Sequence, residues 1–151
     1  MGMPGINKDA WVVVCDGGKV LIYENVGTPL SLRLRLEEAR EQAEAPTHDL
    51  GTERPGRVYA SVGNSRSAVE QPDWHDELER VFLESVARRL DKAVTAGETS
   101  DLFIAAAPRA LGMLRAAYTP AMREALRGEF AKDYVKTPVH ELEKRLLAES
   151  S

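Results

Sequence analysis

Arginine is the residue type whose positions in this sequence most clearly indicate a binding chemistry. Arg109 directly follows Pro108, where an apolar run ends, and Arg115 lies three residues beyond Gly112. A guanidinium group donates paired hydrogen bonds to phosphate or carboxylate oxygens, and helix N-termini also attract anions. The spacing therefore predicts an anion-binding site around Arg109 and Arg115; a solvated helix face is the alternative interpretation.

A second group of arginines lies in a long polar stretch, residues 53–77. Arg54 and Arg57 flank a Pro-Gly pair, and Arg66 follows an Asn-Ser pair. Arginines on a loop can grip a phosphate backbone, so we expect Arg57 and Arg66 to contact an anionic partner. The alternative is a surface loop that only covers a sheet.

Histidine and acidic residues allow two further chemistries. His75 precedes Asp76 and could serve in metal binding or acid–base work; a surface position is the simpler interpretation, because neither other histidine shows ligand spacing to it. Asp16 ends an apolar run, where a carboxylate could help to bind divalent metals; a turn role is the alternative. Its partners would come from three other acids: Glu77, Glu79 and Asp133.

The composition limits the partners of this chain. Its 151 residues carry a net charge of −4, with a pI of about 5.5. This charge disfavours non-specific binding to nucleic acid or an anionic membrane, but allows a local basic patch. Cys15 is the only cysteine, which excludes an intrachain disulfide and a cysteine-based metal cluster. We expect its thiol to be buried and inert, and the sequence predicts no cofactor.

The start of the sequence and its apolar runs bear on location. Residues 1–10 lack the apolar core of a signal peptide. No apolar run reaches the roughly 18 residues of a membrane-spanning helix. We therefore expect a cytoplasmic protein without a transmembrane segment.

Apolar patterns predict a sheet that begins with a hairpin. Residues 10–15 and 19–25 form two β-type runs, and the Asp16-Gly17 pair between them is a strong hairpin signal. Alternating leucines predict a third, half-buried strand at residues 29–38. Further strands are expected at residues 56–62, 101–107 and 129–135.

Helical periodicity begins after the polar stretch. Residues 63–72 are predicted as loop, and Asp73 as the N-cap of a long amphipathic helix that Gly97 ends. In a helix that starts at Pro108, Gly112 is expected to permit close contact between helix and sheet. Two more helices are predicted, one from Pro120 to the helix-breaking Gly128 and one beginning at Thr137 and Pro138.

The predicted element order is β-β-β-α-β-α-β-α. This order indicates an α/β fold with a single mixed β-sheet and helices packed on it. The length of the chain and the lack of internal repeats indicate one domain. We place this domain at residues 10–149, after a flexible N-terminus at residues 1–9.

Four segments of the sequence resemble the bacterial host attachment proteins, a family described as required for attachment to host cells. The resemblance runs from Trp11 to Leu146. The segments are WVVVCDGGKVLIYEN, ERPGRVYASVGNSRSAVEQPDWHDELERVFLESVARRL, DLFIAAAPRALGMLR and EFAKDYVKTPVHELEKRL.

That family is similar to the middle domain of archaeal and eukaryotic peptide-release factors, which implies an RNase H-like layout. The release-factor domain carries a catalytic Gly-Gly-Gln in the loop before its first long helix. The matching loop here, Gly56–Pro72, contains Gly-Asn-Ser and no Gly-Gly-Gln. The resemblance therefore does not extend to the residues of release-factor catalysis.

The resemblance also implies a set of site residues, because the family's recurring polar positions can be carried over one by one. They fall on Arg54, Gly56, Arg57, Arg66, Asp73, His75, Pro108, Arg109, Gly112, Arg115, Lys132 and Asp133. No catalytic or metal-ligating role comes with them. The anion- or RNA-binding residues that we expect are Arg57, Arg66, His75, Arg109, Arg115 and Lys132.

We therefore expect a non-catalytic binding module with an Arg-rich face that engages RNA, tRNA or the ribosome. Two alternatives stay open. One is a metal-dependent nuclease or peptidyl-tRNA hydrolase that uses Asp16 or His75. The other is an attachment factor that acts at the cell envelope.

Overall fold

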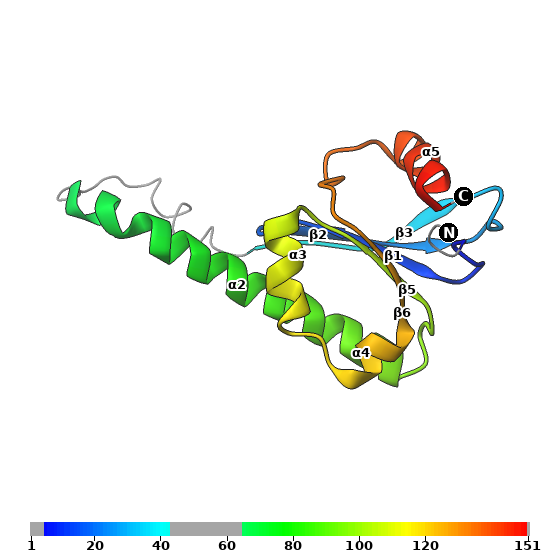
Figure 1. Ribbon diagram of the computed structural model, residues 1–151, viewed down its shortest axis with the longest axis horizontal. Coiled ribbons are helices and arrows are strands. Elements are labelled where there is room, and N and C mark those ends of the chain that lie inside the picture. Colours follow the sequence, from blue (N-terminus) through cyan, green and yellow to red (C-terminus); the bar gives the residue numbers. More distant parts are fainter. Residues whose placement is uncertain (1–4, 43–64, 151) are drawn as a thin grey trace.

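A five-stranded mixed sheet lies at the centre of the protein, as a computed structural model shows (Figure 1). The structure describes residues 5–42 and 65–150, with the backbone alone for 65–74 and 150. The strands are β1 (Trp11–Cys15), β2 (Lys19–Asn25), β3 (Leu34–Glu41), β5 (Leu102–Ala105) and β6 (Leu126–Phe130). Their order is β3-β2-β1-β5-β6; β1 is antiparallel to β2 and parallel to β5. The prediction of an α/β fold with one mixed sheet is confirmed.

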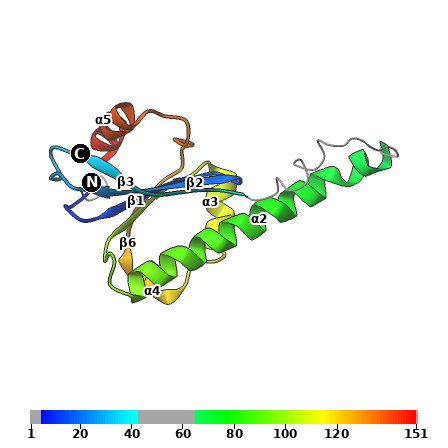
Figure 2. The same cartoon turned by 180° about the vertical axis from the view of Figure 1, so that it is seen from behind.

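Helices cover both faces of this sheet (Figure 1; Figure 2). On one face lie α2 (Ser65–Thr95), α3 (Pro108–Arg115) and α4 (Pro120–Ala125), and on the other lies α5 (Val139–Ser150). The N-terminal part of α2, a helix of 31 residues, extends beyond the sheet. None of the helices within the described ranges has the length and apolar character that crossing a membrane requires.

Strand β1 is the centre of both hydrophobic cores. All five of its residues are buried. Trp11, Val13 and Cys15 pack into the core under α2, α3 and α4. Val12 and Val14 pack into the core under α5. A strand that is buried on both faces has a continuous apolar sequence. The apolar pattern at residues 10–15 therefore predicted β1 correctly.

The hairpin between β1 and β2 is also confirmed. The Asp16 carboxylate accepts hydrogen bonds from the backbone N–H groups of Gly18 and Lys19, each at 2.8 Å. The Asp16 N–H donates to the Lys19 carbonyl at 2.9 Å. Asp16 therefore closes the turn with its side chain, which is a common use of aspartate in tight turns.

Strand β3 begins later than residues 29–38 suggested and contains a β-bulge. Leu36 pairs with one residue of β2 and Glu38 with the next, so Glu37 is an extra residue in the ladder. Such an insertion reverses the alternation of faces, and Glu38 and Arg40 therefore point toward α2. Their contacts are Arg89 Nε to Glu38 Oε1 at 3.0 Å and Arg40 Nη1 to Ser85 Oγ at 3.1 Å.

Helix α2 starts well before the predicted N-cap. It begins at Ser65, so Asp73 is not its cap and the predicted loop at residues 63–72 is wrong from Ser65 onward. The residues from Ala68 to Gln71 tolerate helix, and Pro72 removes only one backbone hydrogen bond from a long helix. The strand predicted at residues 56–62 lies outside the described residues.

The C-terminus of α2 follows the sequence prediction. Gly97 has a φ of 81°, a left-handed conformation in which glycine avoids the cost of a side chain. The Glu98 N–H bonds to the Ala93 carbonyl at 2.8 Å and the Gly97 N–H to the Val94 carbonyl at 3.1 Å. These two bonds form the Schellman motif that ends many helices.

Strand β6 corrects two predictions. It spans Leu126–Phe130 rather than 129–135, and Gly128 lies within the strand instead of ending a helix. The reason is tertiary, because the free edge of β5 pairs with this segment in parallel. Pairing places Phe130 beside Phe103, with ring centroids 6.4 Å apart, and this burial outweighs the weak local pattern.

Asn25 is a fully buried polar residue at the end of β2. Its amide nitrogen donates to the Ile6 carbonyl at 2.9 Å. Its amide oxygen accepts from the N–H groups of Gly27 at 2.9 Å and Arg33 at 3.0 Å. Asn25 thereby connects the N-terminal segment, in which Ile6 is fully buried, to the turn that leads into β3.

We expect Asn25→Ala to lower the free energy of unfolding by about 2–4 kcal/mol, because it leaves several buried backbone groups without partners. Urea denaturation measures this change. Thr28→Ala is the control, since Thr28 Oγ1 accepts one exposed hydrogen bond, from Ser31 N–H at 3.0 Å, in the same turn. An equal effect of both variants would contradict the role assigned to Asn25.

We expect the Cys15 thiol to resist alkylation in the native protein and to react once the protein is unfolded in urea. Burial, with Asp16 and Asp133 nearby, raises the pKa of this thiol from 9.0 to about 12. The folded state thus holds its proton while the unfolded state releases it, so stability falls as pH rises from 9.0 toward 12. Iodoacetamide labelling followed by mass spectrometry checks the reactivity; rapid labelling of native protein would contradict it.

Candidate anion-binding site

The connection from β5 to α3 lies at the carboxyl end of the parallel strands, where open α/β sheets usually bind ligands. Helix α3 starts at Pro108, as predicted. Ala107 precedes it in an extended conformation, and within the described residues no side chain caps the first turn. The first N–H groups of a helix have no partner inside the helix, so this turn is suited to an anion.

Arg109 occupies the first turn of α3 and forms ion pairs with Asp76 and Glu79 of α2. Hydrogen bonding to Glu79, helped by the charge of Asp76, holds the pKa of Arg109 above its ordinary value. All three side chains are at least one-third exposed, Arg109 at 53%. The site is therefore an accessible guanidinium held by two carboxylates of a neighbouring helix.

The other predicted residues of this region are only partly within the described structure. His75 is exposed and directly precedes Asp76 on α2. Arg66 lies in the N-terminal part of α2, where only the backbone is described, and Arg57 lies outside the described residues. The structure thus brings His75 and Arg109 into neighbouring elements.

Arg115 lies at the other end of α3 and forms a separate cluster. Its Nε donates to Glu129 Oε1 at 3.0 Å, and the Tyr118 hydroxyl donates to Glu129 Oε2 at 2.7 Å. Burial acts to raise the pKa of Glu129, but the bonds from Arg115 and Tyr118 outweigh it and hold that pKa below its ordinary value. Burial, followed by the bond to Glu129, raises the pKa of Tyr118.

Lys132 is separated from both arginines. It follows β6 and donates to Glu149 of α5 at 2.8 Å, on the other face of the sheet from α3. The structure therefore divides Arg109, Arg115 and Lys132 among three separate clusters of charged side chains instead of gathering them in one patch. This separation could not be foreseen, because each acidic partner is distant in sequence.

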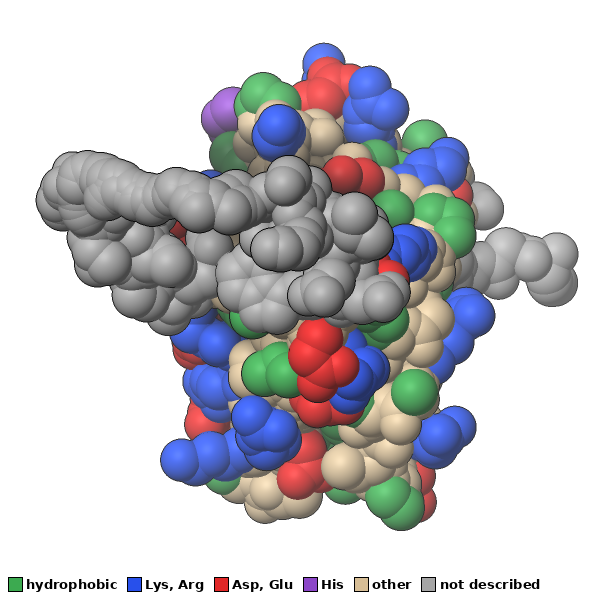
Figure 3. Space-filling model, turned by 90° about the vertical axis from the view of Figure 1, so that its left-hand side faces the viewer, with side chains coloured by type: hydrophobic (Ala, Val, Ile, Leu, Met, Phe, Trp, Pro, Cys, Tyr) green, Lys and Arg blue, Asp and Glu red, His purple; other side chains and the backbone are tan. Residues whose placement is uncertain are grey.

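Charges of both signs are interleaved on the face toward which α2 projects (Figure 3). Outside the grey area, Lys and Arg side chains lie beside Asp and Glu side chains across this view. Extended phosphate backbones bind best to broad basic surfaces. The visible surface therefore suits a local anionic contact better than a long nucleic-acid track.

Gly112 does not have the role that the sequence predicted. It is exposed, and a Cβ placed on it would have no atom of a described residue within 4 Å. The expected close contact between helix and sheet at this glycine is therefore wrong. The sheet side of α3 is instead formed by the buried Ala110, Leu111 and Leu114.

The acids considered for a metal site each have a structural partner. Asp16 closes the β1–β2 turn, Glu79 pairs with Arg109, and Asp133 Oδ1 accepts from Val135 N–H at 3.1 Å. Glu77 pairs with Arg80. In the part of the chain that the structure describes, no group of three or more His, Cys, Asp or Glu side chains is placed to hold a metal ion.

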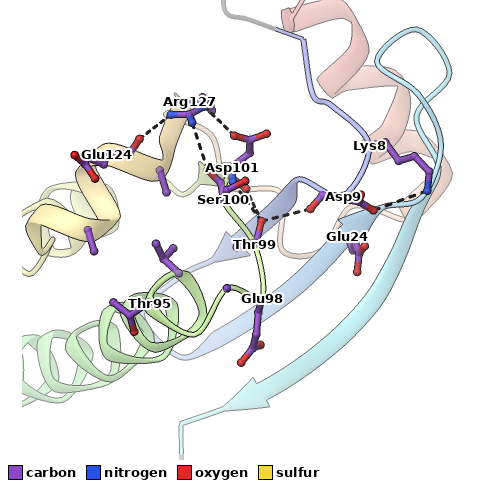
Figure 4. Close-up of a pocket in the computed structure, with 14 residues that line it drawn as sticks. Lys8, Asp9, Glu24, Thr95, Glu98, Thr99, Ser100, Asp101, Glu124 and Arg127 are labelled. Atoms are coloured by element: carbon purple, nitrogen blue, oxygen red, sulfur yellow. Dashed lines mark hydrogen bonds and ion pairs between the residues drawn. The ribbon is translucent and has the colours of Figure 1, made fainter.

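A hollow of about 720 Å³ at the opposite end of the sheet was not predicted (Figure 4). Five acids line it against two bases, which gives a net charge of −3 (Asp9, Glu24, Glu98, Asp101 and Glu124 against Lys8 and Arg127). Arg127 Nε is bound to Asp101 Oδ1 at 2.9 Å. This end therefore repels anions, and the two acids Glu98 and Asp101, close together in sequence, were the pattern that could have indicated it.

Comparisons with known proteins give one family and one relative. The sequence model of a family described as "Protein required for attachment to host cells" matches residues 11–146. An uncharacterized protein of Rickettsia prowazekii (strain Madrid E), RP470, is similar to this chain. The two are 29% identical over 146 residues, which covers 91% of each chain.

We expect Tyr118→Phe to lower the free energy of unfolding by about 1–2 kcal/mol at neutral pH, because Glu129 loses a hydrogen bond to its charged form. The Glu129 pKa lies below 4.5 in the folded protein. The ionised form of Glu129 therefore stabilises the fold fully above pH 4.5, and this stabilisation is lost as the pH falls through the pKa of the folded state. The difference in the free energy of unfolding between variant and wild type should shrink as the pH falls through this pKa.

Urea denaturation at neutral and acidic pH measures this difference. Tyr23→Phe is the control, since Tyr23 is buried and its hydroxyl is expected to be insensitive to the state of Glu129. A loss for Tyr118→Phe that stays constant into the acidic range would show that Glu129 is not the partner that matters.

Proposed function

The chain belongs to the family of proteins required for attachment to host cells, and we propose that it is a non-catalytic binding module that engages RNA at Arg109. The observation that carries the proposal is the position of Arg109, in a first helical turn that no described side chain caps, at the carboxyl end of the parallel strands. A phosphate there would meet both a guanidinium and backbone N–H groups.

The ion pairs of Arg109 are compatible with such binding. Exposed pairs of this kind add little to stability because water screens them, so an incoming phosphate can replace Asp76 and Glu79 at small cost. A phosphate also accepts paired hydrogen bonds from arginine. In this proposal the two carboxylates hold Arg109 in place until RNA arrives, and the exposed His75 next to Asp76 adds a contact. Arg57 and Arg66 stay predicted contacts of the same RNA.

The strand order supports an RNase H-like layout as part of the proposal. Three antiparallel strands are followed by two that join in parallel, in the order β3-β2-β1-β5-β6. A shared layout with the release-factor middle domain would make tRNA or the ribosome the relevant RNA partner. We further propose that the protein works in the cytoplasm and that its part in attachment is indirect.

We expect the chain to bind labelled single-stranded RNA with an affinity that falls steeply with salt. Arg109→Gln should weaken binding by about tenfold or more and reduce the salt slope by about one phosphate contact. The double variant Asp76→Asn, Glu79→Gln should tighten binding, because it releases Arg109 and removes two negative charges. Fluorescence anisotropy across a salt series measures all three proteins.

Arg145→Gln is the matched control. Arg145 is 54% exposed and paired with Glu141, much like Arg109, but lies on α5 across the sheet. Equal binding by the Arg109 and Arg145 variants, or no RNA binding by wild type at low salt, would refute the proposal. Cleavage of the RNA when divalent metal is added would favour the nuclease alternative.

A further inference from the structure

A second hollow lies between the end of α3, the start of α4 and strand β6. It measures about 600 Å³, within the range of about 300–1,000 Å³ that small-ligand sites occupy. Gly112, Ala116 and Leu126 give it a small and apolar floor, and Arg115 and Arg123 supply its positive charge. It differs from the acidic hollow of Figure 4 in both charge and lining.

Gly112 is the first sign that something occupies this hollow. It is the fifth residue of an eight-residue helix, where glycine is less favourable than alanine. Its φ is not in the left-handed region, since Gly97 is the one glycine with positive φ among the described residues. A Cβ would meet no described atom within 4 Å. Neither backbone geometry nor packing against the described residues therefore accounts for a glycine that leaves the backbone bare toward the hollow.

The charges around the hollow are the second sign. Glu129 is its one acid among the described lining residues, and both carboxylate oxygens already accept hydrogen bonds from Arg115 and Tyr118. Arg123 lies over the Tyr118 ring, 6.0 Å from the centroid. It has no carboxylate partner within the described ranges. The two arginines and the satisfied glutamate give the described lining a charge of +1, and Arg123 contributes a guanidinium that contacts the Tyr118 ring and no described carboxylate.

We propose that this hollow binds a nucleoside monophosphate, either as a free nucleotide or as the phosphorylated end of an RNA chain. Arg123 and the unengaged side of Arg115 bind the phosphate, since paired guanidinium contacts suit that group. The base lies against the bare backbone at Gly112 and the side chain of Leu126. Bases are commonly held on apolar, aromatic or guanidinium surfaces of this kind.

The site is separate from Arg109 and does not rest on the RNA contact proposed there. Arg109 pairs with α2, whereas Arg115 and Glu129 join α3 to β6. Glu129 has a positioning role in this arrangement, because it fixes one edge of the Arg115 guanidinium and the Tyr118 hydroxyl. A nucleotide would therefore find Arg115 already oriented.

Isothermal titration calorimetry with AMP and the full chain tests the proposal. Arg123→Gln should weaken AMP binding by about tenfold or more, the size expected for loss of a charge-assisted contact. Gly112→Ala and Gly112→Leu should weaken it progressively while raising the urea midpoint of unfolding, because they fill the hollow and favour the helix. Adenosine should bind at least about tenfold more weakly than AMP. Arg145→Gln, on α5, should leave AMP binding unchanged.

The result that would overturn the proposal is no AMP binding by wild type, or AMP binding that neither Gly112→Leu nor Arg123→Gln changes.

A second experiment distinguishes the two sources of the ligand. It measures how the Arg109→Gln protein binds matched RNA strands that carry either a 5′-phosphate or a 5′-hydroxyl. Tighter binding of the phosphorylated strand, abolished by Arg123→Gln, identifies an RNA end. AMP binding without that difference identifies a free nucleotide. AMP binding that persists while Arg109→Gln has no effect on RNA would remove the proposed function and keep this site.

Discussion

The burial of β1 on both faces and along both edges is the constraint on which the rest of the structure depends. Its side chains alternate between two cores, so helices must cover both sides of the sheet. Its neighbours are antiparallel β2 and parallel β5, and the parallel pairing requires a long crossover, which α2 provides. The crossover brings Asp76 and Glu79 to the carboxyl end of β5, where Arg109 lies in the first turn of α3.

The two ends of the sheet consequently present different charged groups. At the carboxyl end of β5, Arg109 lies beside its two carboxylate partners, Asp76 and Glu79, whereas the opposite end has a hollow with a charge of −3. An anion approaching an acidic protein is therefore guided by local fields rather than by net charge. The ion pairs keep the cationic positions from forming one broad basic surface, which favours compact ligands or single phosphates over long duplexes.

Local sequence patterns predicted the elements that are completely buried. They failed where distant pairing partners determine the secondary structure. The valine run at residues 10–15, the Asp16 turn and the proline starts of α3 and α4 were predictable because each depends on nearby residues. The bulge at Glu37 and the strand at Leu126–Phe130 depend on tertiary contacts. The early start of α2 was missed because Pro72, which lies inside the helix, is typical of a helix boundary. For the site, the place of Arg109 was predictable, but its acidic partners, 30 and 33 positions away, were not.

The buried amide of Asn25 makes the first described residues part of the folding unit. Its hydrogen bond to Ile6 spans 19 positions, and Ile6 itself is fully buried beneath α5. The N-terminal segment can therefore reach its native position only after the second strand and the following turn have formed. A chain shortened to begin at Ala10 would lose the Ile6 and Asn7 carbonyl acceptors and leave the Asn25 amide with its long 3.4 Å bond to the Thr28 carbonyl, so the minimal folding fragment begins before the first strand.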